Sequence, residues 1–388
     1  MIPSRRRGIA PLQFDWNISG LNLVNHSFAL RVQSCEFAAG SNFRASVMRR
    51  LLRDCLGRLV LGLASLLAAG IAAAQDVPRL RLSTENGPDH VQTRIVQSFV
   101  ERVRRDAGGR LVIDYEHSAR LFRDADIVRA LRSGQVEMAV PGTWQLDRIE
   151  PNLALFLLPQ FYGLGSTANY RVRDGALGRV INSRLADQLR LQVLGRWIDL
   201  GFAHIYTIEP PVQAPGQLAG LRIRLPGGEA SAWRLQQLGA LPQIIPWPDV
   251  PNALRQRQVD GLVSTHESIE SAALLRHGLR YCYEDHAYFA QYLPLVAGAF
   301  WSRLDPALQR LLAESWESVV DEGRTLAVIE QESARNRLVA AGLQIVTPSV
   351  GVLAETRRRL LGRQGELVSQ LGIDPALVAM AAEMTARP

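Results

Sequence analysis

The sequence predicts an α/β fold, because short apolar strands alternate with segments of helical periodicity. A strand at 80–83, a helix that begins near Val91 and a strand at 111–115 form one strand–helix–strand unit. A second strand at 220–226 alternates apolar and charged residues and leads into a helix at 229–238. This order of elements is typical of sheets that bind ligands at the carboxyl ends of their strands.

Local signals place the other elements. The first helix ends at Gly108-Gly109. A short helix follows Asp124 and ends at Gly134. A simple N-cap role explains Asp124 without any ligand. Asp305-Pro306 reads as N-cap and N1 of a helix that stops at Gly342, about 36 residues or roughly 54 Å, long enough to brace two lobes. The remaining predictions are strands at 136–140, 153–159, 191–198 and 344–346 and a helix at 353–371.

The first 74 residues are predicted to be absent from the working protein. A basic stretch at 48–53, an apolar run at 59–71 and Ala72-Ala73-Ala74 form a secretory signal peptide cleaved before Gln75. The apolar run is too short to span a membrane comfortably, so we expect an exported, soluble protein that is not membrane-embedded. Residues 1–47 are interpreted as a disordered upstream extension, with a genuine N-terminal tail as the alternative.

Charge and cysteine usage exclude several function classes. Residues 1–74 hold nine arginines and three acidic residues, so the net charge of +7 falls to +1 in residues 75–388, and no nucleic-acid partner is expected. All 44 basic residues are arginine, which excludes Schiff-base chemistry and the P-loop lysine. Cys282 alone follows the cleavage site, so the mature chain has no intramolecular disulfide.

Arg224 is the principal candidate for ligand binding. It lies two residues before Pro226, at the exit of the strand, and Gly227-Gly228 follow it. A planar guanidinium at the mouth of an α/β unit has the geometry to bind a carboxylate. The alternative is that Arg224 is one of many surface arginines.

The stretch from Gly220 to Gly261 resembles the DctP-type substrate-binding proteins of TRAP transporters. The residues that carry the resemblance are Gly220-Leu-Arg-Ile-Arg224, Gly239-Ala-Leu-Pro242, Pro246-Trp-Pro-Asp-Val250, Ala253-Leu254 and Val259-Asp-Gly261. The likeness extends over about residues 80–342. It implies a periplasmic binding protein-like fold of two α/β lobes with a hinge. Lobe I would comprise residues 75–198 and 288–330, and lobe II would comprise residues 199–287 and 331–388.

The resemblance also implies a function. A periplasmic protein of this family captures an organic acid through its carboxylate and delivers it to the membrane subunits of a TRAP transporter, without a cofactor or metal. Five further positions match places where relatives contact ligand or could do so: Asn86, Asp124, Trp144, Trp247 and Ser264. The alternatives are a turn or cap for Asn86 and core packing for Trp247.

At two positions the sequence departs from sialic-acid-binding relatives, and at a third it departs from the pattern of the family. Gly142 stands in place of an acid, and Ser264 stands in place of an asparagine. Ala203 stands in place of a second arginine, whose role His204 or another arginine would have to take over. A ligand-sensing receptor component of the same fold and an exported hydrolase remain as alternatives. The sequence favours no enzyme, because the histidines form no recognised ligand spacing, His266 is interpreted as a helix-start or surface residue, and no G-x-S-x-G motif is present.

Overall fold

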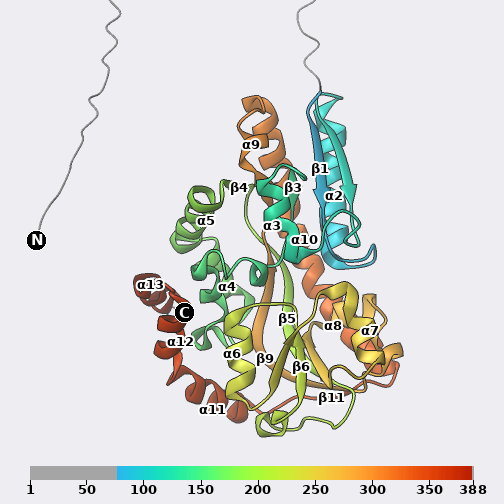
Figure 1. Ribbon diagram of the computed structural model, residues 1–388, viewed down its shortest axis with the longest axis vertical. Coiled ribbons are helices and arrows are strands. Elements are labelled where there is room, and N and C mark those ends of the chain that lie inside the picture. Colours follow the sequence, from blue (N-terminus) through green and yellow to red (C-terminus); the bar gives the residue numbers. More distant parts are fainter. Residues whose placement is uncertain (1–76, 387–388) are drawn as a thin grey trace, which may run out of the picture. The chain divides into compact units, whose positions relative to one another are not determined.

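The computed structural model describes residues 77–386, which contain two β-sheets and the helices that cover them (Figure 1). The predictions for 1–47 and 48–74 lie outside the described residues. The first sheet has the order β2 (Val112–Glu116), β1 (Arg79–Ser83), β3 (Met138–Ala139), β10 (Leu295–Ala297) and β4 (Leu191–Val193). β1 pairs in parallel with β2 and β3, and β10 runs antiparallel to β3 and β4.

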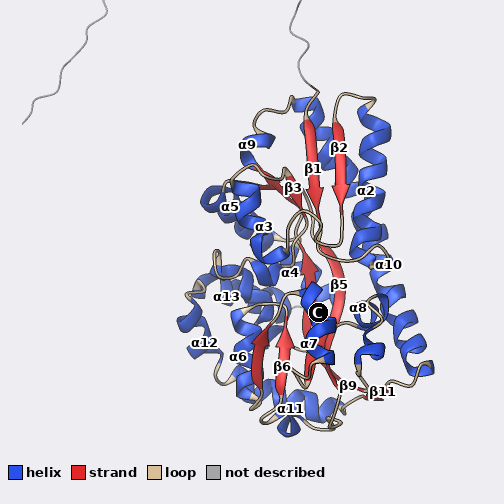
Figure 2. Cartoon of the chain, turned by 45° about the vertical axis from the view of Figure 1, so that its right-hand side comes forward, coloured by secondary structure: helices blue, strands red, loops and turns tan. Residues whose placement is uncertain are grey.

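The second sheet carries the two longest strands. Its order is β11 (Gln344–Val346), β9 (Tyr281–Tyr292), β5 (Ile198–Thr207), β8 (Gly261–Ser264), β6 (Arg222–Leu225) and β7 (Leu241–Ile244). β5 and β9 pair in antiparallel fashion from Ile198–Tyr292 to Thr207–Tyr281, with register shifts after Asp199 and Ala203. The chain enters the second sheet along β5 and returns to the first along β9 and β10, so this pair crosses between the sheets (Figure 2).

Helix α10 (Pro306–Ala340) confirms the predicted long helix. The Asp305 carboxylate accepts hydrogen bonds from the backbone N–H groups of Ala307 and Leu308, and Pro306 occupies N1. The helix contacts α2 (Val91–Ala107) beside the first sheet and α8 (His266–Ser271) and β5 beside the second. It therefore braces both parts of the fold.

The other helices are short. They are α3 (Asp124–Arg132), α4 (Ser166–Arg173), α5 (Ala176–Leu189), α6 (Glu229–Gln237), α7 (Val250–Arg255), α9 (Gly298–Trp301), α11 (Val350–Leu361), α12 (Gln364–Leu371) and α13 (Pro375–Ala386), with 3₁₀ turns at η1 (Thr143–Gln145), η2 (Pro151–Leu157), η3 (Pro159–Phe161), η4 (Pro215–Leu218), η5 (Trp247–Asp249) and η6 (Leu274–His277). Each of the helices from residue 77 to residue 386 is too short or too polar to cross a membrane.

Four sequence predictions of secondary structure need correction. Residues 153–159 form no strand but lie in η2 and η3, because Pro151 starts a turn whose Asn152 N–H is capped by the Glu150 carboxylate. A continuous apolar run in the sequence cannot by itself distinguish a buried strand from a buried helical segment. The strand predicted at 191–198 is interrupted after Val193, where the chain leaves the first sheet, and the strand at 136–140 shrinks to β3. The helix predicted at 353–371 breaks at Gly362-Arg363, and α13 was not predicted.

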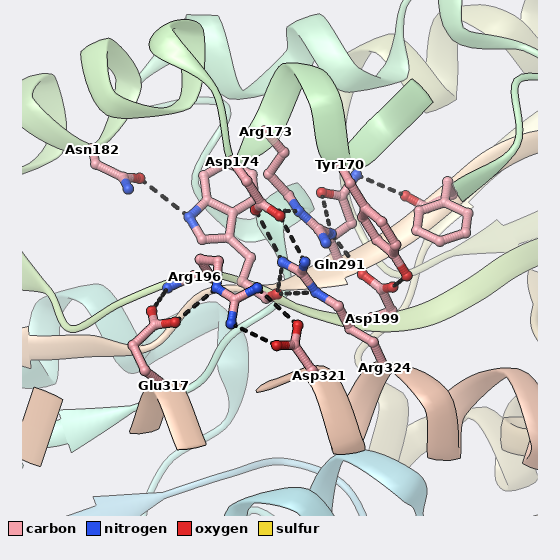
Figure 3. A network of polar contacts seen from close by, with 12 residues as sticks. Tyr170, Arg173, Asp174, Asn182, Arg196, Asp199, Gln291, Glu317, Asp321 and Arg324 are labelled. Carbon is pink, nitrogen blue, oxygen red and sulfur yellow. Dashed lines mark hydrogen bonds and ion pairs between the residues drawn. The ribbon is translucent and has the colours of Figure 1, made fainter. Parts of the chain in front are cut away.

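Buried arginine pairs fasten the start of β5 to the helices around it (Figure 3). Arg173 donates to Asp199 Oδ1 at 2.6 Å and to Gln291 Oε1 at 3.0 Å. Arg324 of α10 makes a two-pronged pair with Asp174, at 2.6 and 3.0 Å, and also donates to the Trp197 carbonyl. These contacts join α4, α10 and both crossing strands at one point.

Candidate functional site

The six residues predicted from the sequence lie around one small cavity of about 40 Å³. Its lining comes from the loop after β1, the start of α3, η1, β5, β6, β8 and β9. The lining residues are Glu85, Asn86, Asp124, Trp144, Ala203, Arg224, Pro226, Trp247, Val263, Ser264, Thr265, Ser268, Tyr288, Ala290 and Tyr292. Residues far apart in the chain thus meet where the two sheets approach each other.

Arg224 is not a surface arginine, since only 2% of it is exposed. Its Nε donates to the Ile245 carbonyl at 2.8 Å, its guanidinium carbon lies 5.4 Å from the centroid of the Trp247 ring, and its Nη2 has no hydrogen-bond partner. No carboxylate in residues 77–386 forms an ion pair with it. Burial lowers the pKa of Arg224 to about 10, so it stays charged at neutral pH. The nearby Glu85 carboxyl group partly opposes this lowering but forms no ion pair with Arg224. A buried cation without a direct ion-pair partner is a strong site for an anion.

Trp144 takes its place in the cavity because residue 142 is glycine. A Cβ on Gly142 would lie 2.2 Å from the Trp144 ring, so any side chain there would displace the indole. The ring makes edge-to-face contacts with Tyr288 and Tyr292, at centroid distances of 6.0 and 5.3 Å. Gly142 itself forms a β-bridge with Tyr292. The glycine found in place of the acid of sialic-acid-binding relatives therefore makes room for an aromatic wall.

Trp247, Ser264 and Asn86 complete the polar and aromatic lining. Trp247 is half-buried in η5 beside Arg224, and its ring also packs against the apolar cluster around α7. Ser264 ends β8. The Asn86 Nδ2 donates to Tyr292 Oη at 3.0 Å and to Gln92 Oε1 at 2.5 Å, so this amide is held in place by its neighbours rather than by a turn.

Asp124 is not the N-cap of its helix, which corrects one of the two sequence interpretations. The helix begins at Asp124, and the cap position is Arg123, which makes no side-chain cap hydrogen bond. Asp124 is 6% exposed, and its backbone N–H donates to Glu85 Oε1 at 3.1 Å. Burial, followed by the proximity of Glu85, raises the pKa of Asp124 well above its usual value.

Glu85, Tyr288 and Tyr292 line the same cavity but were not among the predicted site residues. Glu85 directly precedes Asn86, and burial raises its pKa. Tyr288, Ala290 and Tyr292 alternate along β9, so a strand period of two places all three on the cavity face. That alternation is the signal that could have found the tyrosines, whereas the burial of Glu85 depends on α3 and has no local signal.

Comparison with known proteins identifies the family. A family model described as bacterial extracellular solute-binding protein, family 7 (DctP) matches residues 82–360. The chain belongs to this family. A solute-binding protein of Chromohalobacter salexigens is 24% identical over 283 residues, 73% of this chain and 83% of that protein. The C4-dicarboxylate-binding periplasmic protein DctP of Rhodobacter capsulatus is 24% identical over 293 residues, 75% and 86% of the two chains.

Solved structures share the fold of this family 7 protein. A sugar acid binding protein of Advenella mimigardefordensis in complex with galactonate has a TM-score of 0.75 at 17% identity, covering 80% of this chain and 99% of that one. A TRAP periplasmic solute binding protein of Ralstonia eutropha with bound (S)-2-acetolactate has a TM-score of 0.74 at 20% identity, with the same coverage. The predicted resemblance and the predicted two-lobed α/β fold are thereby confirmed.

Among residues 77–386 no second arginine lines the cavity to replace the one lost at Ala203, and Arg224 is the only basic residue of this part of the chain in the lining. His204 follows Ala203 on β5 and lies instead in a separate hollow of about 340 Å³ with His266, Glu284 and Arg335. The suggestion that His204 supplies the second cation is therefore wrong.

That hollow contains the three residues with metal-ligand chemistry, His204, His266 and Glu284, whose ligand atoms lie within 4.8 Å of one another. His266 is a buried helix-start residue, not a surface one. Its Nδ1 pairs with Tyr206 Oη at 2.8 Å and its Nε2 with Glu284 Oε1 at 3.1 Å. The carboxylate is paired further with Arg335 at 2.6 Å. His266 and Glu284 are therefore already partnered, whereas the buried Nδ1 of His204 has no hydrogen-bond partner. Because two of the three residues are engaged by hydrogen bonds within the protein, the cluster is better explained as a hydrogen-bonded network than as a metal centre.

A serine and a histidine lie beside the cavity but lack the arrangement of a nucleophile and its base. Ser268 Oγ is 2.9 Å from His90 Nε2. The His90 Nδ1 accepts the Gln92 backbone N–H at 3.2 Å, and burial lowers the pKa of His90 to about 3. The neutral ring therefore carries its proton on Nε2 and has no lone pair there to take a proton from Ser268. This geometry does not favour the hydrolase alternative.

The small cavity is a better candidate site than larger hollows. One of about 370 Å³ lies beneath α11 and contains the buried Arg234. That arginine already pairs with Asp285, so its charge is compensated. Of these two cavities, only the one at Arg224 offers a buried cation without a counter-ion.

Proposed function

We propose that this protein is the periplasmic solute-binding component of a TRAP transporter and that it captures an organic acid through the carboxylate. The observation that carries the proposal is the buried Arg224 with its unpartnered Nη2 and no counter-ion. Membership of family 7 and relatives named for carboxylate ligands support the same chemistry. The protein acts by binding and release, not by catalysis.

The contacts of Arg224 define how the acid is held. Its Nε is occupied by the Ile245 carbonyl, which leaves the two terminal nitrogens for the oxygens of a carboxylate. Trp247 fixes the plane of the guanidinium by cation–π contact, and Trp144 forms another part of the cavity wall. A charge-assisted pair formed away from water is stronger than the same pair at the surface.

Capture and release require the two lobes to move. We infer that the lobes have the boundaries predicted above and that they close by bending of β5 and β9, whose register shifts lie beside the cavity. The closed form would dock on the membrane subunits of the transporter. Export through the signal peptide at 48–74 would place the protein in the periplasm.

The substitution Arg224→Lys tests the proposal. Lysine keeps the charge but not the planar two-point grip, so binding of the acid should weaken by about 2 to 5 kcal/mol, whereas the melting temperature should stay unchanged. Arg222→Lys is the matched control on the same strand, because Arg222 pairs with the partly exposed Asp260. Calorimetry measures both. An Arg224→Lys protein that binds within about threefold of wild type would contradict the proposal.

A further inference from the structure

The charges around the cavity are unequal in a way that restricts the ligand. Three of its lining residues are an arginine or carboxylic acids: Arg224, Glu85 and Asp124. All three are buried, at 2%, 9% and 6% exposure. One cation is thus faced by two carboxyl groups. At position 203, where the family resemblance predicts a second arginine, this chain has an alanine.

Neither carboxyl group has a direct ion-pair partner, although the charges of Arg224 and Arg123 act on Glu85. Within the described part of the chain, no ion pair involves Glu85 or Asp124. Glu85 accepts the Asp124 backbone N–H, and Asp124 is stabilised by the backbone N–H of Gly142. Other buried carboxylates of this chain, such as Asp199 and Asp285, have arginine partners. The two cavity acids therefore retain capacity to accept hydrogen bonds from something else.

The donors that remain for a second negative group on the ligand are neutral hydroxyls, of Ser264 and of Tyr288, whose Oη has no hydrogen-bond partner. The Asn86 amide is occupied by Gln92 and Tyr292. The Ser268 hydroxyl is shared with Thr265 and His90. A second carboxylate would therefore find no cation of its own once Arg224 holds the first. It would lie beside two buried carboxyl groups, which repel it to the extent that they are ionised, and little water would screen the repulsion.

We propose that the ligand is a monocarboxylate that carries a hydrogen-bond donor, a hydroxyl or ammonium group, away from its carboxylate. Arg224 binds the carboxylate, and Glu85 and Asp124 accept the donor. Dicarboxylates are rejected. This inference rests on the proposed function of the same cavity and makes Glu85 a specificity-determining residue.

A panel of acids matched in carbon number tests the inference. Thermal shift and calorimetry would compare 4-hydroxybutanoate, 4-aminobutanoate, butanoate and succinate, and likewise gluconate and glucarate. The tightest binder should be a monocarboxylate with a donor, at least tenfold tighter than the dicarboxylate of its set. The relative affinities of 4-hydroxybutanoate and 4-aminobutanoate show whether the donor is a hydroxyl or an ammonium group. A dicarboxylate as the tightest binder overturns the inference while leaving the proposed function intact, and binding of none of the acids overturns both.

Neutral amides at the two acids sharpen the test. Glu85→Gln and Asp124→Asn keep the shape but remove the charge, so the preference for the monocarboxylate over its dicarboxylate partner should fall at least fivefold in either variant. Glu267→Gln is the matched control, because Glu267 is also a buried carboxyl, with its pKa raised to about 8 by burial, but does not line the cavity. A preference unchanged in both cavity variants, measured on folded protein, overturns the role of these acids.

Discussion

Arg173 and Arg224 are equally buried, at 2% exposure, and each has at least one guanidinium nitrogen without a hydrogen-bond partner, yet within the described residues only Arg173 forms an ion pair. Arg173 lies in the network at the start of β5, where Asp199 and Gln291 accept its hydrogen bonds (Figure 3). Arg224 donates only to the Ile245 carbonyl. The fold pairs one buried charge with a carboxylate and leaves the other without an ion pair among the described residues.

The difference separates a residue that maintains the fold from one that serves binding. An uncompensated buried charge is costly, and proteins retain such a feature mainly where function requires it. Where both partners are present, as in the Arg173–Asp199 pair, removing one leaves the other buried and unpaired. The same substitution should therefore have opposite consequences at the two sites.

The largest expected effect is at the paired arginine. Arg173→Met leaves Asp199, which is 1% exposed, without its guanidinium partner. The free energy of unfolding should fall by about 3 to 5 kcal/mol. Denaturant titration measures it, and a loss below about 1 kcal/mol would mean that the network is not the compensated region described here.

At the unpaired arginine the same change should spare stability and abolish binding. Arg224→Met removes a buried cation that has no counter-ion, so the unfolding free energy should be unchanged or higher. Binding of the best acid should weaken by about 2 to 5 kcal/mol. Denaturation and calorimetry on one preparation decide. A protein destabilised as much as Arg173→Met would erase the distinction between the two arginines.

A smaller effect is expected at the wall of the cavity. In Gly142→Ala the new methyl group meets the Trp144 ring, and the strain should cost about 1 to 3 kcal/mol of stability. Affinity should fall as well, since the displaced ring lines the cavity. Gly216→Ala is the control, because nothing lies within 4 Å of its Cβ position. Equal melting temperatures for the two variants would contradict the packing described for Trp144.

A change of pH should change the stability contributions of two kinds of buried carboxyl group in opposite directions: those whose pKa is raised in the folded protein and one whose pKa is lowered. Burial raises the folded-state pKa of Glu85 and Asp124, so their contribution to stability is present below the unfolded pKa, near 4, and is lost as pH rises through the raised values. Although burial opposes it, hydrogen bonding by His266 and Arg335 lowers the pKa of Glu284, whose contribution is lost as pH falls.

Stability measured against pH checks this. In the ligand-free wild-type protein the free energy of unfolding should decline above pH 4, by at most about 1.4 kcal/mol per pH unit for each proton. The double variant Glu85→Gln/Asp124→Asn should not show this decline. Parallel curves for the variant and wild type would show that the cavity acids are not perturbed by burial.

Sequence reasoning succeeded where a few neighbouring residues decide the outcome. Asp305-Pro306 and Gly342 marked both ends of α10, and the family pattern around Arg224 led to six residues that line one cavity. It failed where distant segments meet. The lack of a partner for Arg224 and the position of His204 depend on strand pairing and on which face each side chain takes, which no local pattern records.

The contact between Gly142 and Trp144 also constrains how such a site can change during evolution. Because even a methyl group at 142 meets the indole, an acid at that position requires the Trp144 ring to leave its present place. A chain that gains the acid while it keeps the tryptophan therefore carries the strain of a displaced ring and a cavity without its aromatic wall. The two positions are thus coupled, and a change at one alters what the other can tolerate.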